Sequence, residues 1–122
     1  MLYVINDIIK INEILASYFN SDIYDMFLDG YCLEYADILK MMYPNSKMVI
    51  HKEKDHVGVL IDGNIYDVSG IRNKDEFTYL SEIEEGYVRS FYKKFSSYDK
   101  INIYNLLNEK EKNVVKSINN LI

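Results

Sequence analysis

The stretch that decides the fold is His56-Val57-Gly58-Val59-Leu60-Ile61-Asp62-Gly63-Asn64-Ile65-Tyr66-Asp67. Residues 56–61 and 64–68 are rich in Val, Ile and Tyr, which favour β-strands. The Asp62-Gly63 pair between them is typical of a two-residue hairpin turn. The sequence therefore predicts two antiparallel strands joined by this turn, and Lys47 to His51 predict a third strand.

The register of this hairpin would place two polar side chains on one face. If Ile61 pairs with Asn64, then Gly58 pairs with Asp67, because the two strands run antiparallel. Alternation then puts Asp67 on the same face as His56. Diagonal neighbours of this kind lie roughly 7–8 Å apart, and Gly58 has no side chain to separate them. The opposite face would be core, formed by Val57, Val59, Tyr66 and Val68.

A helix is predicted upstream of the hairpin, over residues 31–43. Its apolar side chains have the i, i+3, i+4, i+7 spacing of an amphipathic helix. They are Cys32, Tyr35, Ala36, Leu39 and Tyr43. Asp29 or Gly30 precedes the helix as a cap, and Pro44 ends it because proline disfavours the α conformation in the residue before it. Cys32 therefore lies in the first turn.

The remaining segments predict further helices. Residues 4–19 have helical spacing with Asn6 or Asp7 as a cap, and residues 20–30 predict a loop or a short helical turn. Residues 69–74 predict an irregular exit from the sheet. Residues 77–83 and 88–95 have helical spacing interrupted at Gly86, although residues 87–92 also fit an alternating strand.

The C-terminal segment completes the predicted domain. Residues 101–107 fit a helical turn or a strand, and Asn108 with Glu111 at the capping-box position predicts a final helix to about Leu121. The expected fold is one α+β domain, residues 1–122. In it the Cys-bearing helix packs on a small antiparallel sheet of at least three strands, with flanking helices at both termini.

Composition narrows the expected partners. The net charge is −5, and residues 1–70 hold eleven acids against five lysines. This acidic front half argues against nucleic-acid binding, which needs clustered Lys and Arg. The sequence shows no signal peptide and no apolar run of transmembrane length, so we expect a cytoplasmic protein without membrane contact. The many Ile, Asn, Lys and Tyr residues suggest an AT-rich bacterial or phage genome.

Three side chains in this pattern point to thiol chemistry. A thiol, an imidazole and a carboxylate are the parts of an activated sulfur nucleophile, and Cys32, His56 and Asp67 supply them. The start of a helix favours a thiolate at Cys32, and so does a protonated His56 nearby. Asp67 would fix the tautomer of His56. The predicted catalytic set is therefore Cys32, His56 and Asp67, with no cofactor and no metal.

Other interpretations of these residues stay open. A lone cysteine on an apolar helix face is usually a small buried hydrophobic residue, and a single His or Asp near a strand is usually structural. His51 is an alternate base, although no Asp is placed beside it by the hairpin. A zinc site formed by Cys32, His51, His56 and an acid matches no closed structural zinc spacing.

The chain also resembles a known superfamily. Gly30-Tyr31-Cys32, His56-Val57-Gly58-Val59 and Tyr66-Asp67-Val68-Ser69-Gly70 are similar to the core of the papain-like and transglutaminase-like cysteine enzymes. In that superfamily a helix with the Cys packs on an antiparallel sheet that supplies the His and an Asp or Asn. The resemblance implies thioester-forming acyl chemistry, which means peptide or isopeptide hydrolysis, deamidation or amide transfer.

By this resemblance Cys32 is the nucleophile, His56 the general base and acid, and Asp67 the orienting group. The chain departs from the pattern because it has no Gln for the oxyanion hole and no Trp near the site. The candidate side-chain donors that remain are Asn20, Ser21 and Tyr24.

Three functions follow as hypotheses. The first is a small cysteine hydrolase or acyltransferase (peptidase, deamidase or transglutaminase-like) that uses the three side chains on a protein or amide substrate, with a protein or peptide as the expected partner. The second is a non-enzymatic phage or mobile-element protein that binds and inhibits a host protein, for which the many Tyr residues suit an interface. The third is a structural domain that keeps the three side chains as a remnant.

Overall fold

The computed structural model describes residues 2–28, 30–53 and 55–121, and the side chains in these ranges except those of residues 2, 3 and 110–121. Within these ranges the chain forms five α-helices, one short 3-10 helix and five strands. In chain order they are α1 (Leu2–Phe19), α2 (Ile23–Leu28), α3 (Cys32–Met42), β1 (Lys47–His51), β2 (Val57–Ile61), β3 (Asn64–Asp67), β4 (Gly70–Arg72), η1 (Lys74–Glu76), β5 (Phe77–Tyr79), α4 (Glu82–Phe91) and α5 (Ser97–Leu121).

The sheet is antiparallel, with the strand order β4-β3-β2-β1-β5. Its central hairpin has the predicted register, with Ile61 opposite Asn64. Asp62 and Gly63 have φ values of 49° and 85°, the pair of positive angles that a two-residue type I′ turn requires. The expected α+β fold, with a Cys-bearing helix on an antiparallel sheet of at least three strands, is confirmed.

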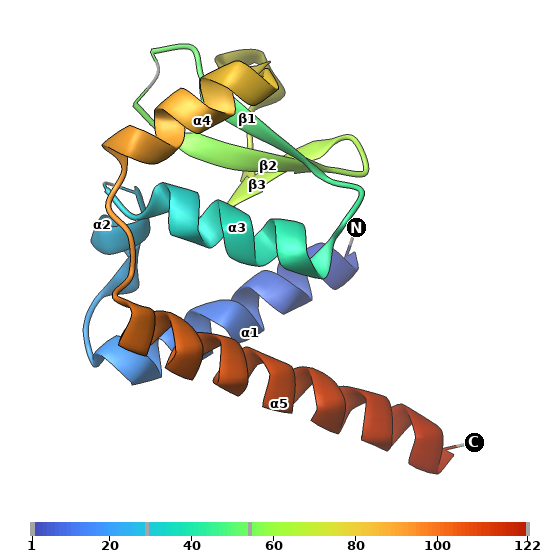
Figure 1. The fold of residues 1–122 in the computed structure, drawn as a ribbon. Helices are drawn as coiled ribbons and strands as arrows, with labels where there is room; N and C mark the ends of the chain where they lie inside the picture. Colours follow the sequence, from blue (N-terminus) through green and yellow to red (C-terminus); the bar gives the residue numbers. More distant parts are fainter. Residues whose placement is uncertain (1, 29, 54, 122) are drawn as a thin grey trace.

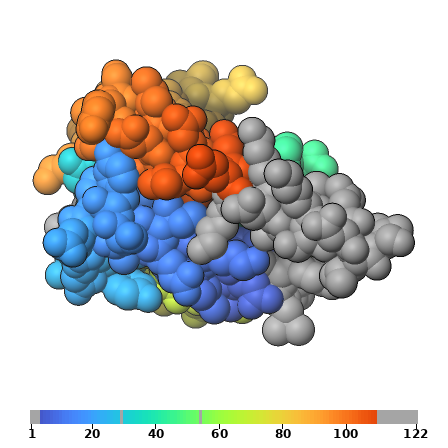
Figure 2. Space-filling view, turned by 90° about the horizontal axis from the view of Figure 1, so that it is seen from below, coloured from blue at the N-terminus to red at the C-terminus, as the bar shows by residue number. Residues whose placement is uncertain are grey.

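The helices form layers against one face of this sheet. Figure 1 shows α3 between the sheet and the terminal helices α1 and α5. The core lies between these layers, where Leu39, Tyr66 and Ile103 are fully buried. Seen from below in Figure 2, the blue helix α1 and the orange start of α5 lie side by side. This packing holds the N-terminus of α3 against the end of the sheet where β2 begins and β3 ends.

The region after the hairpin differs from the prediction. Residues 69–74 are not an irregular exit, because Gly70–Arg72 forms β4 and pairs with β3. Residues 77–81 are not helical either, because Phe77–Tyr79 forms β5 on the outer edge of β1 and α4 begins only at Glu82. An unpaired strand edge has backbone N–H and C=O groups without hydrogen-bond partners. Pairing with such an edge outweighs the local helical spacing of the apolar residues.

The helices near the C-terminus also begin and end at different residues. Ser81 and Glu84 form a capping box that starts α4, and the helix continues through Gly86, which is exposed, to Phe91. The predicted extension to residue 95 and the alternative strand over 87–92 are therefore wrong. The final helix begins at Ser97 instead of Asn108, since the Ser96 hydroxyl accepts the Asp99 N–H at 3.1 Å. The Glu111 side chain lies outside the described residues.

Two more predictions concern the front of the chain. Helix α1 begins at Leu2, so Asn6 and Asp7 lie inside it and are not caps. Residues 23–28 form the short helix α2, in agreement with the predicted loop or helical turn. None of the helices in the described part of the chain is both long and apolar enough to cross a lipid bilayer.

Candidate functional site

Cys32 is the first residue of α3, so its sulfur lies at the helix N-terminus. The N-cap is Tyr31, and it makes no side-chain capping hydrogen bond. The predicted cap Gly30 instead lies one residue earlier with a φ of 110°, and the predicted cap Asp29 lies outside the described residues. The first N–H groups of a helix have no intrahelical partner, so those of Cys32 and its neighbours can receive an anion.

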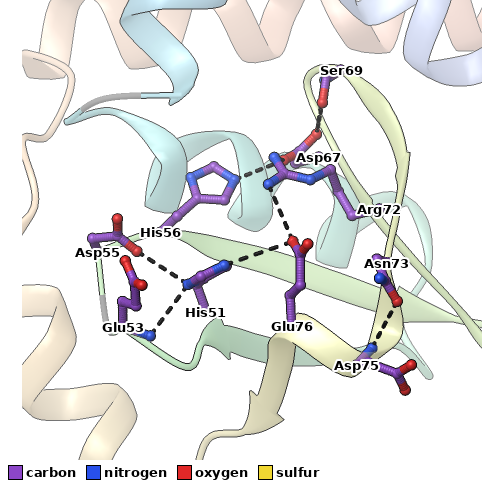
Figure 3. Close-up of polar contacts among 10 residues, drawn as sticks. All are labelled: His51, Glu53, Asp55, His56, Asp67, Ser69, Arg72, Asn73, Asp75 and Glu76. Carbon is purple, nitrogen blue, oxygen red and sulfur yellow. Dashed lines mark hydrogen bonds and ion pairs between the residues drawn. The ribbon is translucent and has the colours of Figure 1, made fainter.

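His56 and Asp67 lie together, as the hairpin register predicts. The His56 Nε2 is 2.7 Å from Oδ2 of Asp67, and both residues are buried (Figure 3). His56 immediately precedes β2, and Asp67 is the last residue of β3. A Cβ added at Gly58 would lie 3.2 Å from the Ile65 side chain and from the Tyr66 carbonyl oxygen. Glycine at 58 therefore allows these two strands and their polar side chains to approach.

Asp67 is held by more donors than the sequence predicted. Ser69 donates to Oδ1 from its backbone N–H at 2.8 Å and from its hydroxyl at 2.5 Å. Arg72 donates to Oδ2 at 2.6 Å, and Figure 3 shows it approaching from β4. Burial alone would raise the pKa of Asp67, but the hydrogen bonds from His56 and Ser69 outweigh it and hold this pKa below its usual value. Asp67 is therefore a carboxylate at neutral pH.

His56 is placed between this carboxylate and the Cys32 thiol. Burial acts to lower the pKa of His56, but Asp67 and the adjacent Cys32 raise it to about 9. With Nε2–H donating to Asp67, the second ring nitrogen is Nδ1, which is buried and has no hydrogen-bond partner among the described residues. A buried nitrogen without a partner is costly, so its position beside a thiol calls for a chemical explanation.

A short segment covers Cys32. Residues 92–96 link α4 to α5, and we call them the strap. The Lys93 N–H donates to the Gly30 carbonyl at 3.0 Å, and the Phe95 N–H donates to the buried Glu34 carboxyl at 3.4 Å. Phe95 also stacks on Tyr31, with ring centroids 5.8 Å apart. Cys32 is consequently only 2% exposed.

Tyr92 at the start of the strap reaches the thiol. Burial, the neighbouring Cys32 and the Asp55 carboxylate raise the pKa of Tyr92 to about 12. Tyr92 is therefore a polar side chain near Cys32 that the sequence did not predict. The predicted donors Asn20 and Ser21 are exposed, and Tyr24 is about half exposed in α2.

Four residues near the site were not predicted from sequence: Glu34, Ser69, Arg72 and Tyr92. For Ser69 a signal existed, because an Asp two residues before a Ser is typical of a side-chain-stabilised turn. Arg72 required recognition of β4, which was predicted as an irregular exit. Glu34 accepts the Phe95 N–H and Tyr92 neighbours Cys32, and no local pattern marks either long-range contact.

His51 is linked to Asp67 indirectly, through Glu76 and Arg72. Its ring accepts the Glu53 N–H at 3.2 Å and lies 3.4 Å from Asp55 and 3.7 Å from Glu76, as Figure 3 shows. Among the described residues, the metal-ligating atoms found within 4.8 Å of one another are those of His51, Glu53 and Asp55. The alternative zinc set of Cys32, His51, His56 and an acid is therefore not assembled.

Comparison with known proteins gives the family. A family model described as Phage YunG-like protein matches residues 8–108. The chain belongs to the Phage YunG-like family. The resemblance to papain-like and transglutaminase-like cysteine enzymes is therefore wrong as a family assignment, because the matching family is a different one, and classification as a cysteine protease is not supported. No curated protein and no solved structure matches the chain.

Membership of the Phage YunG-like family bears on the functional hypotheses. The family description supports the expectation of a phage-associated protein, which belonged to the second hypothesis. It supports no enzymatic activity. The family is therefore the evidence for phage association.

The paired carboxylate gives a pH prediction for stability. The pKa of Asp67 is lower in the folded state than in the unfolded state. The ionised carboxylate therefore stabilises the fold at a pH above its unfolded-state pKa, and this stabilisation is lost as the pH falls through its folded-state pKa. As the pH falls from the unfolded pKa of 3.8 through the lower folded pKa, the wild type should lose about 1.5–3 kcal/mol more unfolding free energy than Asp67→Asn, the range for hydrogen bonds to charged groups. Urea denaturation followed by circular dichroism measures this.

The matched control is Asp75→Asn, which removes an exposed carboxylate in η1. That variant should follow the wild-type acid dependence. If Asp67→Asn also follows it, Asp67 does not titrate with a lowered pKa.

Proposed function

We propose that this Phage YunG-like protein uses Cys32 as a nucleophile toward an amide or thioester carbonyl of a protein or peptide partner. One observation carries the proposal. His56 is held by Asp67 through Nε2 at 2.7 Å, while its buried Nδ1 has no hydrogen-bond partner in the described part of the chain other than the Cys32 thiol, which is near enough to raise the pKa of His56. A purely structural histidine would satisfy both ring nitrogens.

The chemistry needs only groups of this chain and the partner. In the proposed pair Nδ1 of His56 already holds the thiol proton, so the Cys32 sulfur attacks the carbonyl carbon as a thiolate to form a tetrahedral intermediate. The C–N bond of an amide then breaks, and the leaving amine takes the proton back from His56. The resulting thioester is released by water or by another amine, which loses its proton to His56. Asp67 stays ionised and orients the ring throughout.

Two groups could stabilise the oxyanion. The N–H groups at the start of α3 point out of the helix end and carry its positive dipole. The Tyr92 hydroxyl, beside the thiol, is a second donor. Because Cys32 is 2% exposed, the strap has to shift before a large acyl group reaches the sulfur.

A small activated ester tests the proposal without knowledge of the natural substrate. With p-nitrophenyl acetate the wild type should release p-nitrophenol and gain one acetyl group on Cys32, read by intact mass and peptide mapping. Cys32→Ser should show no acetylation at position 32, and His56→Gln should acetylate at least about tenfold more slowly, since a positioned base contributes 10²–10⁴-fold. Acetylation at equal rates in wild type and His56→Gln would contradict the proposal.

A second candidate function is binding and inhibition of a host protein without chemistry. The family description favours it more directly than it favours the first, because it indicates phage association and no reaction. Exposed Tyr87 and Phe91 on α4 also suit a protein interface. Under this function, Cys32→Ser would keep full biological effect and the ester test would give no acetyl-Cys32.

A further inference from the structure

A groove lies beside the candidate site, between α4 and the edge of the sheet. Its volume is about 460 Å³, within the range of ligand-binding pockets. Its walls are mainly apolar, from Ile50 on β1, Leu80, and Val88 and Phe91 on α4. Figure 1 shows α4 running beside β1 at this point.

Two residues connect the groove to the candidate site. Tyr92 lines the groove, and its pKa is raised in part by the neighbouring Cys32. Asp55 also lines it and directly precedes His56 in the chain. A molecule in the groove therefore contacts Tyr92, which neighbours Cys32, and Asp55, the residue before His56.

The open side of the groove is unusually apolar for a surface. Tyr87 and Phe91 are about two-thirds exposed, at 67% and 66%. Their rings pack edge to face, with the ring centroids 4.7 Å apart. Ile83, one turn earlier on α4, is 87% exposed. Clustered exposed aromatic side chains are typical of interaction sites.

The charges of the groove are of one sign. Asp55 and Glu84 line it, and the described lining residues include no Lys or Arg. Glu82 lies in the same turn of α4 as Glu84 and adds to the negative potential. A ligand that matches such a groove has a cationic group next to an apolar group.

We propose that this groove binds an extended peptide segment of a partner protein that carries an aromatic or large aliphatic side chain followed by Lys or Arg. The apolar side chain contacts Val88 and Phe91, and the cation lies between Asp55 and Glu84. The segment then leads past Tyr92 toward Cys32. The inference rests on the proposed function only in this last step, presentation of a carbonyl to Cys32.

Binding of synthetic peptides tests the groove apart from the chemistry. The probes are fluorescein-labelled hexapeptides with two central Phe residues, flanked by Lys, by Ser or by Asp. Fluorescence anisotropy is measured with the full chain carrying Cys32→Ser, so that no covalent step contributes. The Lys-flanked peptide should bind at least about fivefold more tightly than the Ser-flanked peptide, the factor expected for about 1 kcal/mol of ion pairing. The Asp-flanked peptide should bind least.

Matched variants locate the binding. Glu84→Gln removes a lining charge but keeps the capping box, because Gln also serves at that position. This variant should bind the Lys-flanked peptide about fivefold more weakly and bind the Ser-flanked peptide with unchanged affinity. Glu82→Gln removes a charge from the same turn of α4, at a residue that does not line the groove. It should lower the affinity for the Lys-flanked peptide less than Glu84→Gln does. Phe91→Ala should weaken the binding of all three peptides.

The outcomes separate this inference from the proposed function. No binding by any peptide, equal binding by all three, or indifference to both Glu84→Gln and Phe91→Ala would overturn the groove proposal, even if Cys32 reacts with esters. If the peptides bind in the expected order of affinity but Cys32 does not react with esters, the groove proposal is supported and the protein is a binding module.

Discussion

Asp67→Ala is expected to lower the free energy of unfolding by about 3–5 kcal/mol, the cost of removing one partner from a buried charged pair. Asp67 is 3% exposed and holds the His56 ring, Ser69 and Arg72 at 2.5–2.8 Å. Its removal leaves a buried imidazole with no partner on either nitrogen. Chemical denaturation monitored by circular dichroism measures the loss.

A graded control separates charge from shape. Asp67→Asn keeps the size of the side chain and one acceptor oxygen, so it should cost less than Asp67→Ala. Arg72→Ala, which removes a partner that is 27% exposed, should cost less again. A loss below about 1 kcal/mol for Asp67→Ala, the level of a surface pair, would show that the buried network does not stabilise the fold.

His56→Gln is expected to slow the reaction of Cys32 with iodoacetamide at pH 7 at least about tenfold. Iodoacetamide alkylates the thiolate, and a neighbouring imidazolium favours that form of a thiol. His56 carries that charge because its pKa is raised to about 9 by Asp67 and Cys32 against the effect of burial. The rate is read by mass spectrometry of the alkylated protein.

Access to the sulfur has to be controlled in this experiment, because the strap covers it. In urea, wild type and His56→Gln should react at the same rate, since the pair exists only in the folded protein. His51→Gln, which removes the other histidine of the chain, should leave the folded rate unchanged. A folded His56→Gln protein that reacts within twofold of wild type would show that His56 does not activate Cys32.

The centre of the fold could be predicted because its signals are local. Asp62-Gly63 defines a two-residue turn, and the turn alone fixes that Val59 faces Tyr66 and that Asp67 comes near His56. The helix with Cys32 was predictable from its apolar spacing and from Pro44. These elements together placed the three candidate side chains at one end of the sheet.

The rest depends on contacts that sequence spacing does not reveal. Phe77 has helical spacing with its neighbours, yet it lies in β5 because the edge of β1 was open. The final helix starts eleven residues earlier than Asn108 because Ser96 caps it and Ile103 packs in the core against the other helices. The strap and Tyr92 reach Cys32 from sixty residues away.

The same limit applies to the family. A Cys on a helix, a His on a strand and an Asp on the next strand describe a geometry that unrelated sequences can share, so they do not identify a lineage. The match over residues 8–108 places the chain in a phage family instead. The three side chains keep their value as a chemical hypothesis about this site.

Nuclear magnetic resonance titration of the two histidine rings tests most directly whether Asp67, His56 and Cys32 act as one group. The account predicts that one ring, assigned to His56 by its absence in His56→Gln, titrates near pH 9 in the wild type. It also predicts that this midpoint moves lower in Cys32→Ser, because the thiol no longer supports the imidazolium. A His56 midpoint at or below 6.5, or one indifferent to Cys32→Ser, would contradict the central claim.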